Sequence, residues 1–170
     1  MTPKKPHVDR QPEYPPFMFG YGVLPAMFAK IQDRDAPEIF SHEYLRFTLG
    51  FSRESDRAFI ALAKRIGLLA TDGKPTDLYR EYLKPDLAHA ALAKGIQHGF
   101  SKFYARHANA HELERKMLAA LVAELTGLEI GHATARAVVG TFITLKTLAY
   151  PGLQVERSVN RRKVAERRSF

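Results

Sequence analysis

The sequence contains no cysteine among its 170 residues. This absence excludes disulfides, thiolate nucleophiles and every zinc or iron–sulfur site with cysteine ligands. Long apolar runs are also missing, because no stretch approaches about 18 apolar residues and the N-terminal MTPKKPHVDRQPEYPPF has no apolar run behind its lysines. Neither a signal peptide nor a membrane span is therefore expected, and we expect the chain to work in the cytoplasm.

Familiar catalytic signatures are absent as well. The sequence has no Gly-x-Ser-x-Gly, His-Glu-x-x-His, Walker or Rossmann glycine pattern. Carboxylates are spread along the chain without an obvious pair. We therefore expect no catalytic residue and no cofactor, and we expect that the protein is not an enzyme.

The positive charge of the chain is unevenly distributed. The net charge is +8, yet residues 14–155 hold 17 basic and 14 acidic side chains. Residues 156–168 hold six basic and two acidic side chains, and the basic ones include Arg161, Arg162 and Lys163. Such a tail can add non-specific affinity for phosphates, because each neutralised phosphate releases counterions, or it can be a solvated end of the chain.

Length and composition predict one compact fold. With 170 residues, 45% of them hydrophobic, the chain can bury a sizeable core. Five prolines in residues 1–16 predict a flexible, extended arm. We expect one subdomain over residues 17–85, a helical subdomain over residues 86–152 that shares its core, and a basic tail over residues 153–170.

Apolar residues recur at helical spacing through most of the chain. The expected helices cover residues 24–34, 41–50, 52–66, 77–84, 86–106, 111–126 and 131–149. Ser41, Thr76 and either Ser52 or Ser55 are suited to cap the helices that follow them, and Gly127 is suited to end one. The last helix is apolar around most of its circumference, so we expect it to be buried inside the subunit or between the subunits of a homodimer.

A turn signature separates the third and fourth expected helices. Residues 68–76 read as a strand, an Asp72-Gly73 turn and a return strand that Pro75 would confine to a sheet edge. Three helices followed by a hairpin are typical of a winged helix-turn-helix. We therefore expect a mainly α fold, with a winged helix-turn-helix-like N-terminal part, one short β-hairpin and a C-terminal helical bundle.

The expected third helix has a basic side. Arg57, Lys64 and Arg65 lie opposite its apolar residues, Arg53 precedes it, and Lys74 follows it on the hairpin. Such a face can lie in the major groove of duplex DNA while the hairpin contacts phosphates. The simpler interpretation is a solvated helix face, because acidic side chains at positions 54 and 56 weaken its positive field. The predicted nucleic-acid-binding residues are Arg53, Arg57, Lys64, Arg65, Lys74, Arg161, Arg162 and Lys163.

The competing interpretation is a helical module that binds another protein. Its contact surface would be the proline-rich arm or the aromatic residues Phe100, Phe103 and Tyr104, which at this spacing are also typical of a core. The expected partners are thus duplex DNA, another protein or a second copy of the chain, and not a membrane.

Two further patterns have simpler interpretations. Residues 127–135 partly match a helix-hairpin-helix, in which glycine amides bind phosphate, but two extra residues separate the glycines. A plain connection between helices, with Gly127 as the C-terminal cap, is the simpler interpretation. His107 and His111 stand four residues apart, as two metal ligands on one helix would, but no third ligand is near them in the sequence, and we expect no metal site.

Several strings resemble a bacterial family described only as a domain of unknown function. They are YPPF, VLPAMFAKIQ, PEIFSHEYL, LGFSRESDRAFIALAKRIGLLATDGKPTDLYREY and TARAVVGTFITLKTLA. The resemblance covers residues 14–149, and the long middle string is its specific part. It implies a compact, helix-rich bacterial domain and carries no catalytic residue that could be transferred to this chain.

Overall fold

The computed structural model describes residues 13–153 and, in the tail, residues 162, 165, 167 and 168. This part of the chain is mainly helical, as predicted. The α-helices are α1 (Leu24–Gln32), α2 (Ala58–Arg65), α3 (Asp77–Leu83), α4 (Ala88–Gly99), α5 (Ser101–Arg106), α6 (Arg115–Thr126) and α7 (Ala133–Ala149). Shorter helical turns are η1 (Tyr21–Val23), η2 (Tyr44–Thr48), η3 (Glu54–Arg57) and η4 (Ala110–Glu112).

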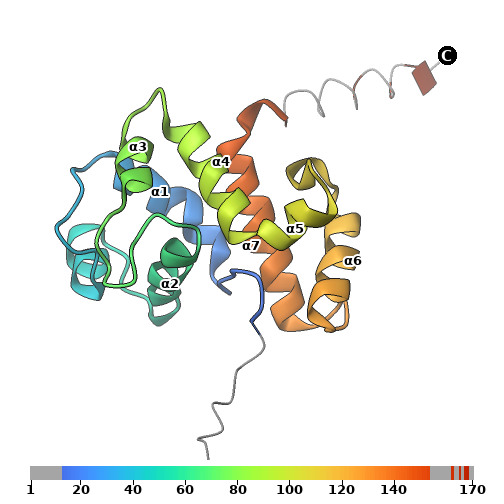
Figure 1. Cartoon of the computed structure of the whole chain (residues 1–170), viewed down its shortest axis with the longest axis horizontal. Helices are drawn as coiled ribbons and strands as arrows, with labels where there is room; N and C mark the ends of the chain where they lie inside the picture. The colour runs from blue at the N-terminus through green and yellow to red at the C-terminus, as the bar shows by residue number, and fades with distance from the viewer. Residues whose placement is uncertain (1–12, 154–161, 163–164, 166, 169–170) are drawn as a thin grey trace, which may run out of the picture.

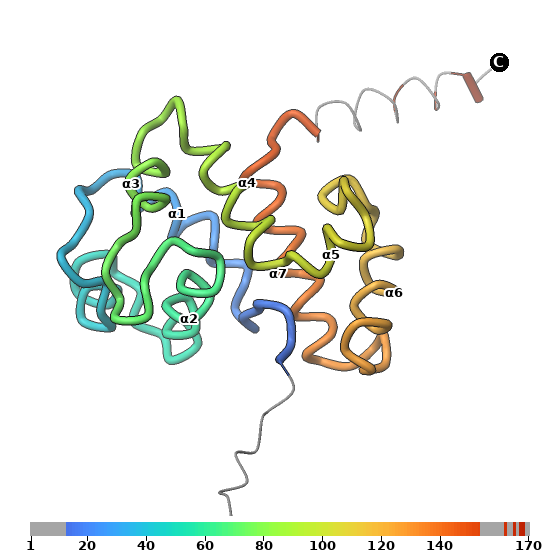
Figure 2. The backbone as a smooth tube through the Cα atoms, in the orientation of Figure 1, coloured from blue at the N-terminus to red at the C-terminus, as the bar shows by residue number. Residues whose placement is uncertain are grey.

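Helix α7 lies at the centre of the molecule. It packs against α4, α6, α1 and η1. Figures 1 and 2 show α2 and α3 on one side of α4 and α7, and α5 and α6 on the other side. The buried apolar residues of α7 are Ala135, Ala137, Val138, Val139, Phe142, Leu145 and Ala149. Its apolar circumference is therefore covered within one chain, which is one of the two arrangements expected from the sequence.

One cluster of buried apolar side chains runs through the molecule and includes residues from both sides of α7. On the N-terminal side, Phe28 and Phe59 meet edge to face with ring centroids 5.6 Å apart. On the C-terminal side, Phe100 and Phe142 meet in the same way at 5.0 Å. Because edge-to-face pairs add to the gain from burial, these aromatic residues stabilise the contacts between helices.

The aromatic residues predicted as a protein-contact surface belong mainly to this core. Phe100 and Phe103 are 1% and 0% exposed, respectively. Tyr104 is half-buried, and its hydroxyl lies 3.2 Å from His111 Nδ1. That part of the prediction is therefore wrong for the two phenylalanines, because the bend between α4 and α5 turns both rings towards α7.

The region predicted as a β-hairpin is a tight loop. In the described residues it holds one isolated antiparallel bridge, between Leu69 and Pro75, and no strand. The Ala70 N–H donates to Lys74 O at 2.8 Å and the Gly73 N–H donates to Ala70 O at 2.9 Å, with Gly73 at φ +87°. Three residues thus form the turn, and a glycine at positive φ is typical of that loop length. On the other side of Pro75 the Thr76 N–H donates to Leu68 O at 3.0 Å, and the pairing ends there because Asp77 already begins α3.

Two predicted helices differ from the prediction, one in its cap and one in its hydrogen-bond pattern. The third begins as η3, where the buried Asp56 carboxylate accepts the Arg53 N–H at 3.0 Å, so the first turn is capped by Asp56 rather than by Ser52 or Ser55. The second is a π-type turn, closed by the Leu49 N–H and Tyr44 O at 3.0 Å. Over only five residues, the spacing of apolar side chains does not distinguish a π-helix from an α-helix.

The helix predicted over residues 86–106 is broken at Phe100 into α4 and α5. Two glycines of α4 lie directly against the end of α2. A Cβ at Gly95 would lie 2.8 Å from Ile66 O, and one at Gly99 would lie 2.8 Å from Ile66 Cγ2. The close contact between helices is therefore possible only without side chains at these positions.

The N-terminal arm is described only from Glu13 onward. Pro15 and Pro16 are buried, so the part of the chain that packs on the body begins before residue 17. Met18 is anchored to α7, because its N–H donates to Thr141 Oγ1 at 3.1 Å and its carbonyl accepts from the same hydroxyl at 3.3 Å.

Candidate nucleic-acid interface

The basic side of α2 lies where the sequence predicts it. Phe59, Ile60, Leu62 and Ala63 are buried. Arg57, Ala61 and Arg65 are exposed on the other side, and Lys64 is half-buried beside them. This spacing of four residues puts the exposed positions in one row along the helix.

Two of the predicted cations have acidic partners. Arg57 Nη1 lies 3.0 Å from Glu54 Oε1, and Lys74 Nζ lies 3.8 Å from Asp72 Oδ2. All four side chains are more than half exposed. Because exposed ion pairs contribute about 0–1 kcal/mol, these cations can exchange a carboxylate for a phosphate at little cost.

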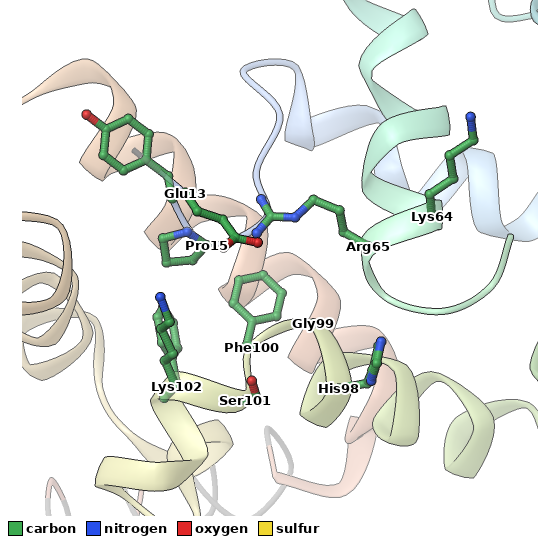
Figure 3. Close-up of a pocket in the computed structure, with 11 residues that line it drawn as sticks. Glu13, Pro15, Lys64, Arg65, His98, Gly99, Phe100, Ser101 and Lys102 are labelled. Atoms are coloured by element: carbon green, nitrogen blue, oxygen red, sulfur yellow. The ribbon is translucent and has the colours of Figure 1, made fainter. Parts of the chain in front are cut away.

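The end of the α2 face opens into a pocket of about 330 Å³, which we call the junction pocket. Lys64 and Arg65 line it from α2, His98 lines it from the end of α4, and Ser101 and Lys102 line it from the start of α5. Figure 3 shows Arg65 and Lys102 reaching in from opposite sides of Phe100, whereas the Lys64 ammonium points away. The pocket thus gathers cations from two helices that are far apart in the sequence.

The N-terminal segment closes one side of the junction pocket. Glu13, Tyr14 and Pro15 line it there, and Glu13 contributes the one carboxylate among the lining side chains. His98 and Lys102 also line the pocket and are not among the predicted site residues. Nothing in the sequence marks them, because they approach Arg65 only through the packing of Gly95 and Gly99 on Ile66.

The structure describes only two of the remaining predicted cations, Arg53 and Arg162. Arg53 is exposed just before η3. In the tail, Arg162 is exposed, while Arg161 and Lys163 lie outside the described residues. The described part of the predicted site is therefore α2, the residue before η3, the loop after α2 and one tail residue.

Within residues 127–135, the first six form a plain connection between α6 and α7, and the last three already belong to α7. Gly127 ends α6 with φ +71°, and its N–H donates to Ala123 O at 2.9 Å. The His132 side chain caps α7, because its Nδ1 accepts the Thr134 N–H at 3.1 Å. One amide at the start of α7 thus already has a side-chain acceptor, which favours the simpler interpretation over a phosphate site.

The two histidines spaced four apart do not share a helix. His107 follows α5, whereas His111 lies in η4 and stacks on Tyr150, with ring centroids 4.0 Å apart. Burial lowers the pKa of His111, the nearby Lys146 lowers it further, and Glu112 opposes the shift. Over residues 13–153 and the four described tail positions, no three His, Asp or Glu side chains are grouped closely enough to hold a metal ion.

Among the residues that the structure describes, no helix combines the length and apolar character needed to span a membrane.

Comparisons with known proteins identify a family but no activity. No curated protein and no protein of solved structure matches the chain. A family model described as a family of unknown function (DUF5343) matches residues 16–151, and the chain therefore belongs to this family.

Proposed function

We propose that this chain is a bacterial, cytoplasmic DNA-binding protein or regulator of winged-helix type, with α2 as the helix that enters the major groove. The observation that carries the proposal is the exposed row of Arg57, Ala61 and Arg65 along α2. Arg53 and Lys74 flank this row at the helix start and on the following loop.

The shape of this face is compatible with a DNA groove. A helix with its side chains is about 10–12 Å in diameter, and the major groove is about 12 Å wide, so a helix such as α2 can lie in the groove. Ala61 at the centre of the row leaves room for close approach. The loop over residues 68–76 would take the place of the wing, and its Lys74 ammonium would contact backbone phosphates.

Fluorescence anisotropy with duplex DNA across a salt series tests this proposal. We expect the full chain and a version ending at Val155 both to bind, with an affinity that falls steeply as salt rises. The triple variant Arg57→Ala/Lys64→Ala/Arg65→Ala should lose most of this binding, and each lost phosphate contact should reduce the salt slope by about 0.9.

A matched control removes the same charge from the other side of the molecule. Arg115→Ala/Lys116→Ala/Arg136→Ala changes three exposed cations on α6 and α7 and should bind DNA like the parent. If the α2 variant is folded and binds as tightly as this control, the proposal is wrong.

A protein-interaction module, as a monomer or a homodimer, is the second candidate. It is favoured by exposed apolar side chains, since Phe47 on η2 is 76% exposed and Phe19 is 65% exposed. An affinity capture after nuclease treatment, repeated with Phe47→Ser, tests it. A stoichiometric protein that is lost with the variant supports this candidate, whereas recovery of nucleic acid alone contradicts it.

A further inference from the structure

The junction pocket contains two cations, Arg65 and Lys102, that form no ion pair within 4.0 Å with a carboxylate of the described residues. Arg57, Lys74, Arg80, Lys94 and Arg106 each form an ion pair with a carboxylate. Arg65 and Lys102 outnumber the one carboxylate that lines the pocket, that of Glu13. Charges that face one hollow attract an anion more strongly than the same charges on a flat surface, because the surrounding protein focuses the field.

The chemistry of the pocket fits a phosphate group. A guanidinium such as that of Arg65 can donate two parallel N–H bonds to phosphate oxygens, and an ammonium such as that of Lys102 adds a point charge. Ser101 supplies a hydroxyl donor beside Lys102. The buried ring of Phe100 lies between the two cations and gives the pocket an apolar base.

The size of the pocket fits more than a bare ion. A volume of about 330 Å³ lies in the lower part of the range of small-molecule sites, which is about 300–1,000 Å³. We propose that the junction pocket binds a small phosphate-bearing molecule of mononucleotide size, with its phosphate held by Arg65, Lys102 and Ser101. This site goes beyond the proposed DNA-binding function, because Ser101 and Lys102 are not among the residues proposed to contact DNA.

The Glu13 carboxylate competes with phosphate for the cations of the junction pocket. Its carboxylate is the one negative charge among the side chains that line the pocket, and it comes from the N-terminal segment. A carboxylate near the same cations repels the incoming phosphate and reduces the net field. Removing this charge should therefore strengthen phosphate binding, which a purely structural role of Glu13 would not do.

Isothermal titration calorimetry on the full chain without DNA tests the site, with AMP, inorganic phosphate and adenosine as probes. We expect AMP to bind with one-to-one stoichiometry, inorganic phosphate to bind more weakly, and adenosine not to bind. Lys102→Gln should weaken AMP binding about tenfold, the usual effect of losing one charge-assisted hydrogen bond. Glu13→Gln should tighten it several-fold, and the exposed control Lys116→Gln should leave it unchanged.

Several outcomes would overturn the inference. Absence of AMP binding, or equal binding of adenosine, excludes a phosphate site, and equal affinity for AMP and inorganic phosphate excludes a nucleotide-sized one. Unchanged binding by Lys102→Gln, with Lys102→Arg as the conservative comparison, removes Lys102 from the site. Because these titrations contain no DNA, their failure is distinguishable from failure of the DNA-binding proposal.

Discussion

Single residues of this protein owe their properties to neighbours that are distant in the sequence. His111 is the clearest case, since its ring stacks on Tyr150 and its Nδ1 lies 3.2 Å from the Tyr104 hydroxyl. The pKa of His111 is lowered, first by burial and then by the positive charge of Lys146. The spacing of His107 and His111 suggested a metal pair, but the contacts of His111 are aromatic.

The lowered pKa of His111 predicts a dependence of stability on pH. The imidazole is harder to protonate in the folded chain than in the unfolded chain, whose histidine pKa is 6.5. Its contribution to stability is therefore complete above that value and is lost as the pH falls through the lower pKa of the folded state. Thermal unfolding from about pH 7.5 to about pH 5 should show a smaller loss of stability for His111→Gln than for the parent.

A control variant assigns this effect to its position. His42→Gln changes an exposed histidine outside the cluster of Tyr104, His111 and Tyr150. If His42→Gln reduces the dependence on pH as much as His111→Gln does, the explanation given for His111 is wrong.

At the scale of the element, helix ends were predictable where one residue decides them. Ser41 accepts the Tyr44 N–H at 3.1 Å, Thr76 accepts the Tyr79 N–H at 3.4 Å, and Gly127 ends α6, all as predicted. The break at Phe100 was not predictable, because it accompanies the contact of α4 with Ile66 on a different segment. Caps are local chemistry, whereas breaks of this kind depend on tertiary packing.

Gly127 offers a test of the statement that a single residue can decide where a helix ends. Its φ is +71°, and a Cβ there would meet nothing within 4 Å, so the cost of Gly127→Ala is a backbone cost alone. We expect a loss of about 1 kcal/mol in the free energy of unfolding measured with urea, since alanine is disfavoured in the left-handed region. Gly131→Ala is the matched control, because that site also has open space and lacks a positive φ, and it should be close to neutral.

The comparison of the two glycines has a clear negative outcome. Equal losses for Gly127→Ala and Gly131→Ala would mean that the conformation of Gly127 does not carry the effect.

At the scale of the whole molecule, α7 holds the N-terminal segment of the described chain. Met18 and Thr141 exchange two hydrogen bonds, at 3.1 and 3.3 Å, and both residues are buried. The N-terminal segment that follows Glu13 is thereby fixed to the central helix. This contact also places the N-terminal segment beside the junction pocket, which Glu13, Tyr14 and Pro15 line.

Thr141→Val tests this connection. Valine has nearly the same shape but leaves the buried Met18 N–H and carbonyl without partners, which should cost about 1–3 kcal/mol in urea unfolding. Thr144→Val is the control on the same helix, because the Thr144 hydroxyl bonds only the Gly140 carbonyl one turn earlier, at 2.8 Å. A loss for Thr144→Val as large as that for Thr141→Val would contradict the role given to the Met18 contact.

The sequence by itself determined the helical class, most helix positions and the exposed basic side of α2. These features follow from apolar spacing and caps, which act within one or two turns. Only the tertiary structure decided that Phe100 and Phe103 belong to the core and that Arg65 meets Lys102 across a pocket. The physical reason is that each depends on which distant segment packs against which, and this choice is made by the complementary surfaces of the whole chain, such as the bare backbone of Gly95 and Gly99 against Ile66.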